Sequence, residues 1–192
     1  VWQAFFLGVL QGLTEFLPVS SSGHLVLVEH LLGVPVTDDI TFEVFVHFGT
    51  LLSVVVVLGK DIVEMSKSFL EAVTGIHLTK KRYQENEYFR LGVYILLASI
   101  PAAVVGIRYE DEISAAFTDP KLVAVMLIFT GLILYLTRLS RPAEPKSIGL
   151  FQALLVGVAQ AVAIIPGISR SGSTMSMAIY LRVTPIQAAR FS

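Results

Sequence analysis

The sequence predicts an all-α integral membrane protein, with transmembrane helices plus two re-entrant helix–loop–helix hairpins in an inverted-topology repeat. Of its 192 residues, 54% are hydrophobic and only 15% are charged, whereas a soluble domain carries about 25% charged residues. Three apolar stretches come close to the roughly 20 residues that a membrane-spanning helix needs. Two further apolar stretches are interrupted by Pro, Gly and Ser, which are tolerated at membrane depth only where protein or a water-filled cavity satisfies the backbone.

The loops between the three predicted spans differ in charge, and this difference sets their orientation. The spans are expected at residues 40–59, 90–107 and 122–137. The connections over residues 60–90 and 138–146 are basic, but residues 108–121 between them are acidic. Basic loops stay in the cytoplasm, so the two basic connections face inside and the acidic one faces outside. Within the first basic connection, residues 62–73 are typical of an amphipathic helix at the membrane interface.

The two interrupted stretches cover residues 2–32 and 147–181. The first is broken by PVSSSGH at residues 18–24, and the second by PGISRSGST at residues 166–174. Each arm has about 10–17 residues, which is short for crossing a bilayer and suits a re-entrant hairpin. A broken helix inside the membrane therefore indicates a functional site.

The two interrupted stretches also match each other when the first is shifted by 149 residues. The shift pairs identical residues on both sides of the breaks: Gly8 with Gly157, Gln11 with Gln160, Ser20 with Ser169, Ser22 with Ser171, and Gly23 with Gly172. The charge bias gives the two copies opposite orientations, which makes them an inverted repeat and places a site near the bilayer midplane. The alternative is that these small residues only let helices pack closely.

We expect one membrane domain over residues 1–192, with repeat 1 at about 1–59 and a truncated repeat 2 at about 147–192. The chain opens on Val1 and stops as a new segment begins, so we expect it to be incomplete at both ends. The net charge of −1 argues against nucleic acid as a partner, since such a partner needs a basic patch. The absence of cysteine excludes disulfides and cysteine-ligated metals.

The first break carries an acid, an imidazole and several hydroxyls. Gln11 and Glu15 are four residues apart and share a helix face. An ionisable group at membrane depth is costly and is taken as functional by default. The other candidates at this break are Ser20, Ser21, Ser22 and His24. In the first span, Glu43 and His47 share a face and either line the cavity or form a mutually satisfied polar pair.

The second break carries a cation among hydroxyls. Around Arg170 lie Ser169, Ser171, Ser173 and Thr174. The planar guanidinium suits phosphate oxygens, and a helix that begins at each break presents free N–H groups that favour phosphate. If both breaks meet, two helix N-termini and Arg170 form a pyrophosphate cradle. The alternative is that Arg170 only pairs with Glu15 while the serines cap helices.

Three motifs carry a family resemblance: QGLTE at residues 11–15, PVSSSGH at 18–24 and PGISRSGST at 166–174. With these motifs the chain resembles the undecaprenyl pyrophosphate phosphatases, also called bacitracin-resistance proteins, along essentially its whole length. The resemblance implies a hydrolase that converts undecaprenyl pyrophosphate to undecaprenyl phosphate plus inorganic phosphate. This reaction recycles the lipid carrier for peptidoglycan synthesis and gives bacitracin resistance. It also implies a multi-pass protein of the bacterial plasma (inner) membrane, with an active site open to the outer (periplasmic) face.

Roles for the residues at the breaks follow as hypotheses. We expect Arg170 to bind the pyrophosphate, Ser21 to attack the terminal phosphorus, and His24 to take or supply a proton. Glu15 orients His24, activates water or holds the divalent cation, Mg²⁺ or Ca²⁺, that the resemblance implies. Many relatives have Glu where this chain has Gln11, which moves acid–base and metal duties toward Glu15. Phosphate-binding contacts are expected from Gln11, Ser20, Ser22, Ser169, Ser171, Ser173 and Thr174.

Two alternatives stay open at this point. In the first, water attacks the phosphorus directly and Ser21 only binds the substrate. In the second, the protein is a polyprenyl-phosphate transporter or flippase with the same midplane site, because inverted repeats with broken helices are typical of transporters. The expected partners are a polyprenyl pyrophosphate and membrane lipids, and a homodimer is a possible assembly.

Overall fold

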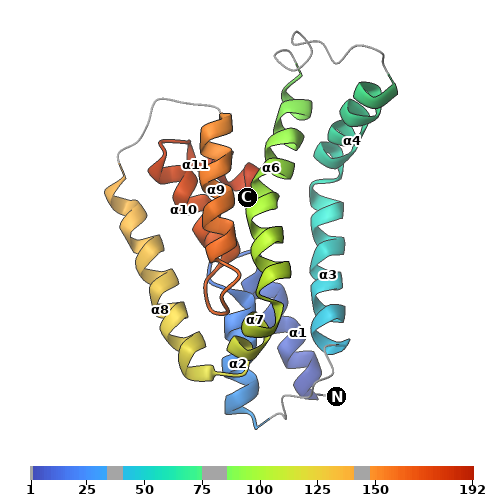
Figure 1. Cartoon of the computed structure of the whole chain (residues 1–192). Helices are drawn as coiled ribbons and strands as arrows, with labels where there is room; N and C mark the ends of the chain where they lie inside the picture. The colour runs from blue at the N-terminus through green and yellow to red at the C-terminus, as the bar shows by residue number, and fades with distance from the viewer. Residues whose placement is uncertain (1, 34–40, 75–85, 141–147) are drawn as a thin grey trace.

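The structure, a computed structural model, describes residues 2–33, 41–74, 86–140 and 148–192 of the chain. Within these residues every regular element is a helix (Figure 1). In chain order the helices are α1 (Trp2–Glu15), α2 (Ser21–Leu31), α3 (Thr41–Val57), α4 (Gly59–Thr74), α6 (Glu87–Arg108), α7 (Glu110–Phe117), α8 (Pro120–Leu136), the short 3₁₀ helix η1 (Thr137–Leu139), α9 (Leu150–Val162), α10 (Arg170–Tyr180) and α11 (Pro185–Phe191).

Two of the described helices are long and apolar enough to cross a membrane. They are Glu87–Arg108 and Pro120–Leu139, and they coincide with the spans expected at residues 90–107 and 122–137. The span expected at residues 40–59 is different, because its helix bends by 79° between α3 and α4. The chain therefore has up to three candidate spans in its described part, the third being this bent pair.

The bend between α3 and α4 has a simple cause in the sequence. Gly59 is a poor helix former, and it is followed by the charged residues Lys60 and Asp61. Charged side chains are costly inside a bilayer, so a change of helix direction at this point brings them out of an apolar layer. The helix predicted over residues 62–73 is present as the body of α4, while its position at a membrane interface stays a prediction.

Two helix–break–helix units stand at opposite ends of the chain. In each unit the two helices pack against one another, α1 with α2 and α9 with α10. The bounds of α10 lie 149 residues beyond those of α2 at both ends. The two helices also end alike: the capping N–H groups of Leu32 and Leu181 bond corresponding carbonyls, and the next residues, Gly33 and Arg182, have positive φ values of 61° and 64°.

The two breaks touch each other in a reciprocal way. A Cβ atom built on Gly23 would lie 2.9 Å from the Cα atom of Gly167, and one built on Gly172 would lie 2.8 Å from the carbonyl oxygen of Pro18. The shift of 149 residues converts the first of these contacts into the second. Such a pair of contacts is what a two-fold axis between the units produces, and it leaves no room for a side chain at either glycine.

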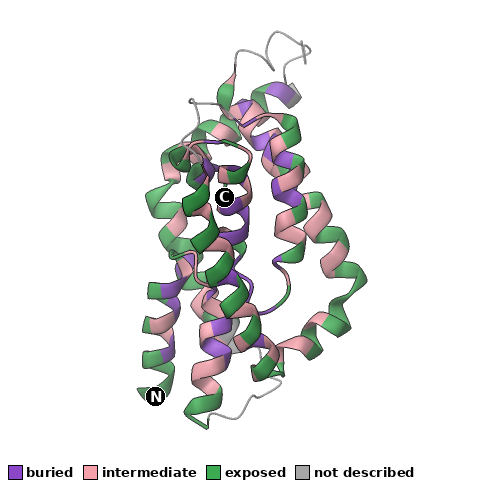
Figure 2. Cartoon of the chain, turned by 90° about the vertical axis from the view of Figure 1, so that its left-hand side faces the viewer, coloured by how far each residue is buried: buried purple, intermediate pink, exposed green. Residues whose placement is uncertain are grey.

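The helices are arranged so that the contact between the breaks is central. In Figure 1, α1 and α2 occupy the lower part of the molecule and α9 and α10 the upper part, and the breaks point toward each other. Helix α6 packs along α9, and α8 contacts both α2 and α10. Figure 2 shows that buried residues concentrate on the inward sides of these helices, while the outer faces are exposed. Many large apolar side chains are on the exposed faces, among them Phe45, Val56, Ile107, Ile128 and Leu139, which suits a lipid-facing surface.

Candidate active site

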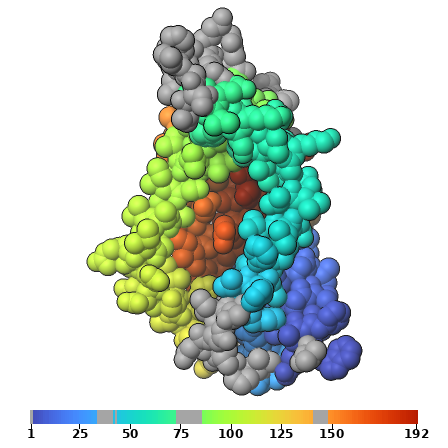
Figure 3. Space-filling model, turned by 90° about the vertical axis from the view of Figure 1, so that its right-hand side faces the viewer, coloured from blue at the N-terminus to red at the C-terminus, as the bar shows by residue number. Residues whose placement is uncertain are grey.

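One cavity of about 600 Å³ is lined by residues from both breaks and from the first turns of the helices that follow them. Its polar lining residues are Glu15, Ser20, Ser21, Ser22, His47, Gln160, Ser169, Arg170, Ser171 and Ser192. The size is in the range of small-molecule sites, about 300–1,000 Å³. Figure 3 shows the hollow between α3 and α6, with residues of α9 and of the last helices at its floor. The cradle expected from the sequence thus has a counterpart in the structure.

The carboxylate of Glu15 collects two hydrogen bonds at the end of α1. The Ser21 hydroxyl donates to Glu15 Oε2 in a short contact, and the Gln11 Nε2 amide donates to the same oxygen over 2.9 Å. Ser21 is the first residue of α2, so the break folds its hydroxyl back onto an acid six positions earlier. A hydroxyl bonded to a carboxylate is the arrangement that activates an oxygen nucleophile.

Ser20 holds the first break in an unusual backbone conformation. Its φ of 67° lies in the left-handed region, which is uncommon for a residue other than glycine. Its hydroxyl accepts from the N–H of Gly23, which caps α2, and its carbonyl accepts from His24 Nδ1 over 2.8 Å. Because Nδ1 of His24 donates, its Nε2 is the nitrogen able to accept a proton. Backbone strain of this kind is concentrated at functional sites.

Arg170 starts α10 just after its capping residue. The Ser169 hydroxyl accepts from the N–H of Gly172 over 3.0 Å, which matches the cap made by Ser20 in the first unit. The Arg170 side chain is exposed to the cavity. Within the described residues it has no ion-pair partner, so the expected alternative, a pair with Glu15, is not formed there. Its charge is available for an anion.

The electrostatics of the cavity favour a phosphate. Helices α2 and α10 both begin at its wall, and the partial positive charge of a helix N-terminus attracts anions. Arg170 adds a permanent positive charge, while Glu15 is the acid among the lining residues. The cavity therefore brings together two helix N-termini, a guanidinium and a hydroxyl–carboxylate pair, the kinds of group that phosphoryl transfer requires.

Comparison with known proteins agrees with this geometry. A family described as "Bacitracin resistance protein BacA" matches residues 4–192. The chain belongs to this family. The protein named undecaprenyl-diphosphatase of Salinibacter ruber is 45% identical over 192 residues, covering all of this chain and 71% of the relative. That of Halothermothrix orenii is 42% identical, covering all of this chain and 68% of the relative. Undecaprenyl-diphosphatase 1 of Bacillus licheniformis is 43% identical, covering 97% of this chain and 67% of the relative.

Some residues predicted from the motifs lie away from the cavity wall. Gln11 is fully buried. It is outside the cavity lining, but it donates a hydrogen bond to Glu15, which lines the cavity. Ser173 and Thr174 are buried on α10, and the Thr174 hydroxyl donates to its own helix at the carbonyl of Arg170. His24 is half-buried and is outside the cavity lining. Direct contacts of these four residues with a phosphate stay predictions.

Of the two polar residues expected in the first span, His47 lines the cavity. The side chain of Glu43 lies outside the described residues, so the suggested pair between them stays a prediction. The expectation that these residues line the cavity is therefore supported for His47.

The structure adds site residues that the motifs did not identify. Gln160 lines the cavity, and its signal was present in the sequence as the repeat partner of Gln11. Ile113 and Phe117 of α7 line the cavity; nothing in a short acidic segment distinguishes them beforehand. Thr130 of α8 bonds the second break and is separated from it by almost 40 residues, so no local pattern indicates it.

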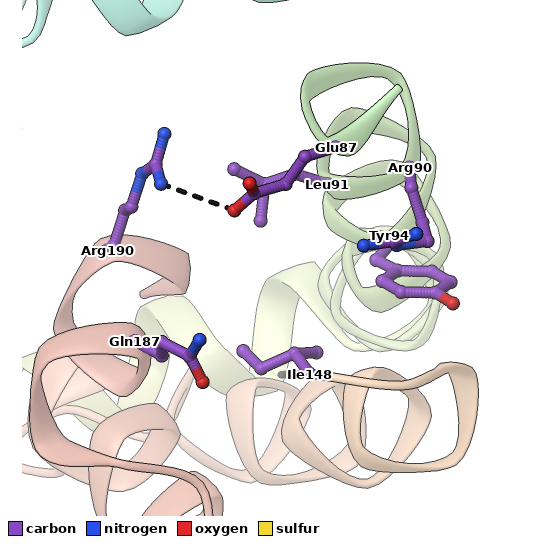
Figure 4. Close-up of a pocket in the computed structure, with 7 residues that line it drawn as sticks. All are labelled: Glu87, Arg90, Leu91, Tyr94, Ile148, Gln187 and Arg190. Atoms are coloured by element: carbon purple, nitrogen blue, oxygen red, sulfur yellow. Dashed lines mark hydrogen bonds and ion pairs between the residues drawn. The ribbon is translucent and has the colours of Figure 1, made fainter. Parts of the chain in front are cut away.

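A second pocket, of about 50 Å³, lies at the other end of the bundle, between α6, α9 and α11 (Figure 4). Arg190 reaches Glu87 over 3.5 Å and Asp61 over 3.3 Å, and it lies over the Tyr88 ring. Partial burial lowers the pKa of Arg190, but the carboxylates of Asp61 and Glu87 outweigh this and raise it overall. The positive charge of Arg190 is thus already balanced by two carboxylates. Its ion pairs join α11 to α4 and α6, and the arginine is not available to bind an anion.

Replacing Arg190 with methionine is expected to weaken this junction without affecting the cavity. The side chains of Arg190 and Asp61 are about one-third exposed and that of Glu87 about two-thirds, so loss of the ion pairs should lower the free energy of unfolding by about 1 kcal/mol or less. High salt should produce a similar drop in the wild type. Thermal unfolding in detergent measures this effect. Lys121→Met is the matched control, since Lys121 is exposed and forms no ion pair within the described residues. A drop of several kcal/mol in the free energy of unfolding of Arg190→Met would contradict the interpretation of these ion pairs as partly exposed surface contacts.

Proposed function

We propose that this chain hydrolyses undecaprenyl pyrophosphate to undecaprenyl phosphate and inorganic phosphate, which recycles the lipid carrier for peptidoglycan synthesis and gives bacitracin resistance. The observation that carries the proposal is the shared cavity, in which the Ser21–Glu15 pair and Arg170 lie at two helix N-termini. Membership of the bacitracin-resistance family agrees with it, as does the name of relatives that are 42–45% identical. These names do not favour the transporter alternative.

We propose that the two helix–break–helix units are re-entrant hairpins of an inverted repeat. The equal bounds and caps of α2 and α10 support this arrangement. The reciprocal contacts between the breaks support a two-fold axis. Helix α1 has 14 residues and α9 has 13, which is short of the roughly 20 needed to cross a bilayer.

The acidic helix α7 forms part of the cavity wall. Glu110, Asp111 and Glu112 form its first turn, and Ile113 and Phe117 of the same helix line the cavity. Basic loops are kept in the cytoplasm, whereas an acidic connection such as α7 is not. This supports an inner-membrane protein whose active site is reached from the outer face.

The apolar part of the cavity suits the lipid tail of the substrate. The apolar lining residues are Phe16, Leu17, Val54, Ala102, Ile113, Phe117, Ala163, Ile164, Ile165 and Ile168. Helix α3 packs mainly on α1 and α4, and α6 mainly on α9 and α4, which leaves the hollow between α3 and α6 that Figure 3 shows. If both helices cross the membrane, this hollow faces hydrocarbon, and an isoprenoid chain can extend from the cavity into the bilayer.

The pyrophosphate is held by fixed donors. Arg170 and the free N–H groups at the start of α10 and α2 bind its oxygens, with hydroxyl contacts from Ser20, Ser22, Ser169 and Ser171. All of these groups belong to cavity-lining residues. Because the donors are fixed by the fold, they stabilise the charge that spreads over the transferring phosphoryl group without having to reorganise.

The chemical step begins at Ser21. Its oxygen attacks the terminal phosphorus while Glu15 accepts its proton, the bond from phosphorus to the bridging oxygen breaks, and undecaprenyl phosphate leaves with the bonding electron pair. Glu15 gives this proton to the departing phosphate and is ionised again. It then takes a proton from the water that attacks the phosphoserine, the bond from phosphorus to the Ser21 oxygen breaks, and the Ser21 oxygen receives that proton as inorganic phosphate leaves. His24 is outside the cavity lining, but it is three residues from Ser21 and its Nε2 is the accepting nitrogen, so its proposed role is to exchange a proton with a phosphate oxygen. The alternative is direct attack by water.

A divalent cation fits the donor set at Glu15 if the substrate completes the site. Within the described residues no group of three or more His, Asp or Glu side chains forms a metal cluster. The buried Oε1 atom of Gln11 has no hydrogen-bond partner among the described residues, and it belongs to the side chain that bonds Glu15. Mg²⁺ is usually held by one or two carboxylates plus substrate phosphates. Glu15 would hold the cation, with the Gln11 oxygen behind it, and the cation would neutralise phosphate charge.

Phosphate release from a C55 polyprenyl pyrophosphate by the protein in detergent tests the function. The wild type is expected to release phosphate, and Glu15→Gln to lower kcat by about 10²- to 10⁴-fold, because the general base is lost while its shape is kept. Thermal unfolding should change little, since an amide still accepts from Ser21. A folded wild type that binds the lipid without cleaving it would instead favour the transporter. A homodimer is a separate prediction, tested by the mass of the detergent-solubilised protein.

A further inference from the structure

We propose that Thr130, on α8, is a positioning residue that sets the location of Arg170 by holding the backbone of the second break. Its hydroxyl donates to the carbonyl of Gly167 over 2.9 Å and accepts from the N–H of Ser169 over 3.0 Å. Ser169 is the residue immediately before Arg170 and caps its helix. The inference rests on the proposed function, because Arg170 is the phosphate-binding cation there.

The behaviour of this hydroxyl differs from that of other helical threonines. Threonines within helices usually bond a carbonyl one turn back on their own helix, as Thr14, Thr50 and Thr174 do. Thr118 and Thr137, which cap α7 and α8, bond the helix that they cap in the same way. Thr130 instead bonds residues 37 and 39 positions away. It is 4% exposed, so the bonds are shielded from water and water cannot replace them.

The two bonds satisfy a segment of backbone that has no regular partner. Gly167 has a φ of 90° and rests directly on α8, where an added Cβ atom would lie 2.4 Å from the carbonyl oxygen of Val123. Ser169 is 2% exposed. A buried N–H and a buried carbonyl both require partners, and one hydroxyl supplies both because it donates once and accepts as well.

The same face of α8 also reaches the first break. A Cβ atom on Gly23 would lie 3.0 Å from Leu127 Cδ2 and 2.9 Å from Gly167 Cα. Helix α8 therefore supports both breaks at the point where they meet, and through them it sets how far Arg170 lies from Ser21. The first break has its own internal support from the Ser21–Glu15 bond, whereas the second depends on Thr130.

Thr130→Val tests the role, since valine keeps the shape and loses both bonds. We expect kcat for phosphate release to fall by about 10- to 100-fold, because small displacements of a positioning group are costly to rate. Thr130→Ser restores the hydroxyl and is expected to stay within about threefold of the wild type. Thr137→Val, at the C-cap of the same helix, is the matched control, because within the described residues the Thr137 hydroxyl bonds only the carbonyl of Leu134 on α8.

Two further readouts separate positioning from general destabilisation. In the Arg170→Ala background, Thr130→Val should change the rate by less than about twofold, since the residues act as one unit. Amide hydrogen exchange over residues 163–172 should accelerate in Thr130→Val and not in Thr137→Val. Equal losses in both backgrounds, or faster exchange with an unchanged kcat, would overturn the inference. If the wild type released no phosphate, the proposed function would fail instead, while the exchange measurement would still test the tether.

Discussion

Replacing Ser21 with alanine should reduce kcat for phosphate release by about 10⁴- to 10⁶-fold, the loss typical when a covalent nucleophile is removed and only the binding groups remain. The structural reason is the contact of its hydroxyl with Glu15, which prepares the oxygen for attack at the start of a helix that attracts the phosphate. The fold should survive, because Glu15 keeps its bond from Gln11. Steady-state release in detergent, beside thermal unfolding of the same samples, measures both effects.

A trapping experiment then distinguishes the two chemical routes. Rapid acid quench with substrate labelled at the terminal phosphate should leave label on the wild type and none on Ser21→Ala. Ser22→Ala is the matched control, since its hydroxyl also lines the cavity but is not bonded to Glu15 within the described residues; it should still carry the label. Substantial turnover by Ser21→Ala would rule out a phosphoserine and support direct attack by water.

The sequence was sufficient for the parts of the fold that depend on local composition. Runs of Pro, Gly and Ser located both breaks, and the serine before each following helix is the cap that the structure contains. The match at a shift of 149 residues likewise anticipated that α2 and α10 would have equal bounds. The two separate helices expected at residues 40–59 and 62–73 are present as α3 and α4, but the angle of 79° between them was not predicted, because apolar composition alone does not fix direction.

The site was predictable as a set of residues but less so as a set of contacts. The bond from Ser21 to Glu15, rather than to His24, depends on how the break folds back. Ser20 adopts a left-handed backbone conformation, and its carbonyl accepts the hydrogen bond from His24. The role of Thr130 depends on a contact between residues almost 40 positions apart. A single threonine in an apolar span is most often bonded within its own helix, so only the fold identifies this one.

Arg170→Ala should reduce kcat/KM by about 10³- to 10⁵-fold, the range found when an arginine that stabilises phosphoryl transfer is removed. Arg170→Lys should recover only part of this loss, because an ammonium group keeps the charge but not the planar fork that binds two phosphate oxygens. Arg182→Asn is the control for loss of a positive charge near the same helix, since asparagine tolerates the positive φ of that position, and it should behave as the wild type.

The stability of Arg170→Ala is as informative as its activity. Removing one partner of a buried ion pair leaves an uncompensated charge and is strongly destabilising. Within the described residues Arg170 has no such partner and is exposed to the cavity, so the variant should unfold at nearly the wild-type temperature while its activity collapses. If instead Arg170→Ala unfolded several degrees lower and kept most of its activity, the arginine would be a structural residue. In the part of the chain that the structure describes, this guanidinium has no protein counter-ion, and it stands at the start of a helix in a cavity with a second helix N-terminus. An anionic substrate accounts for this arrangement.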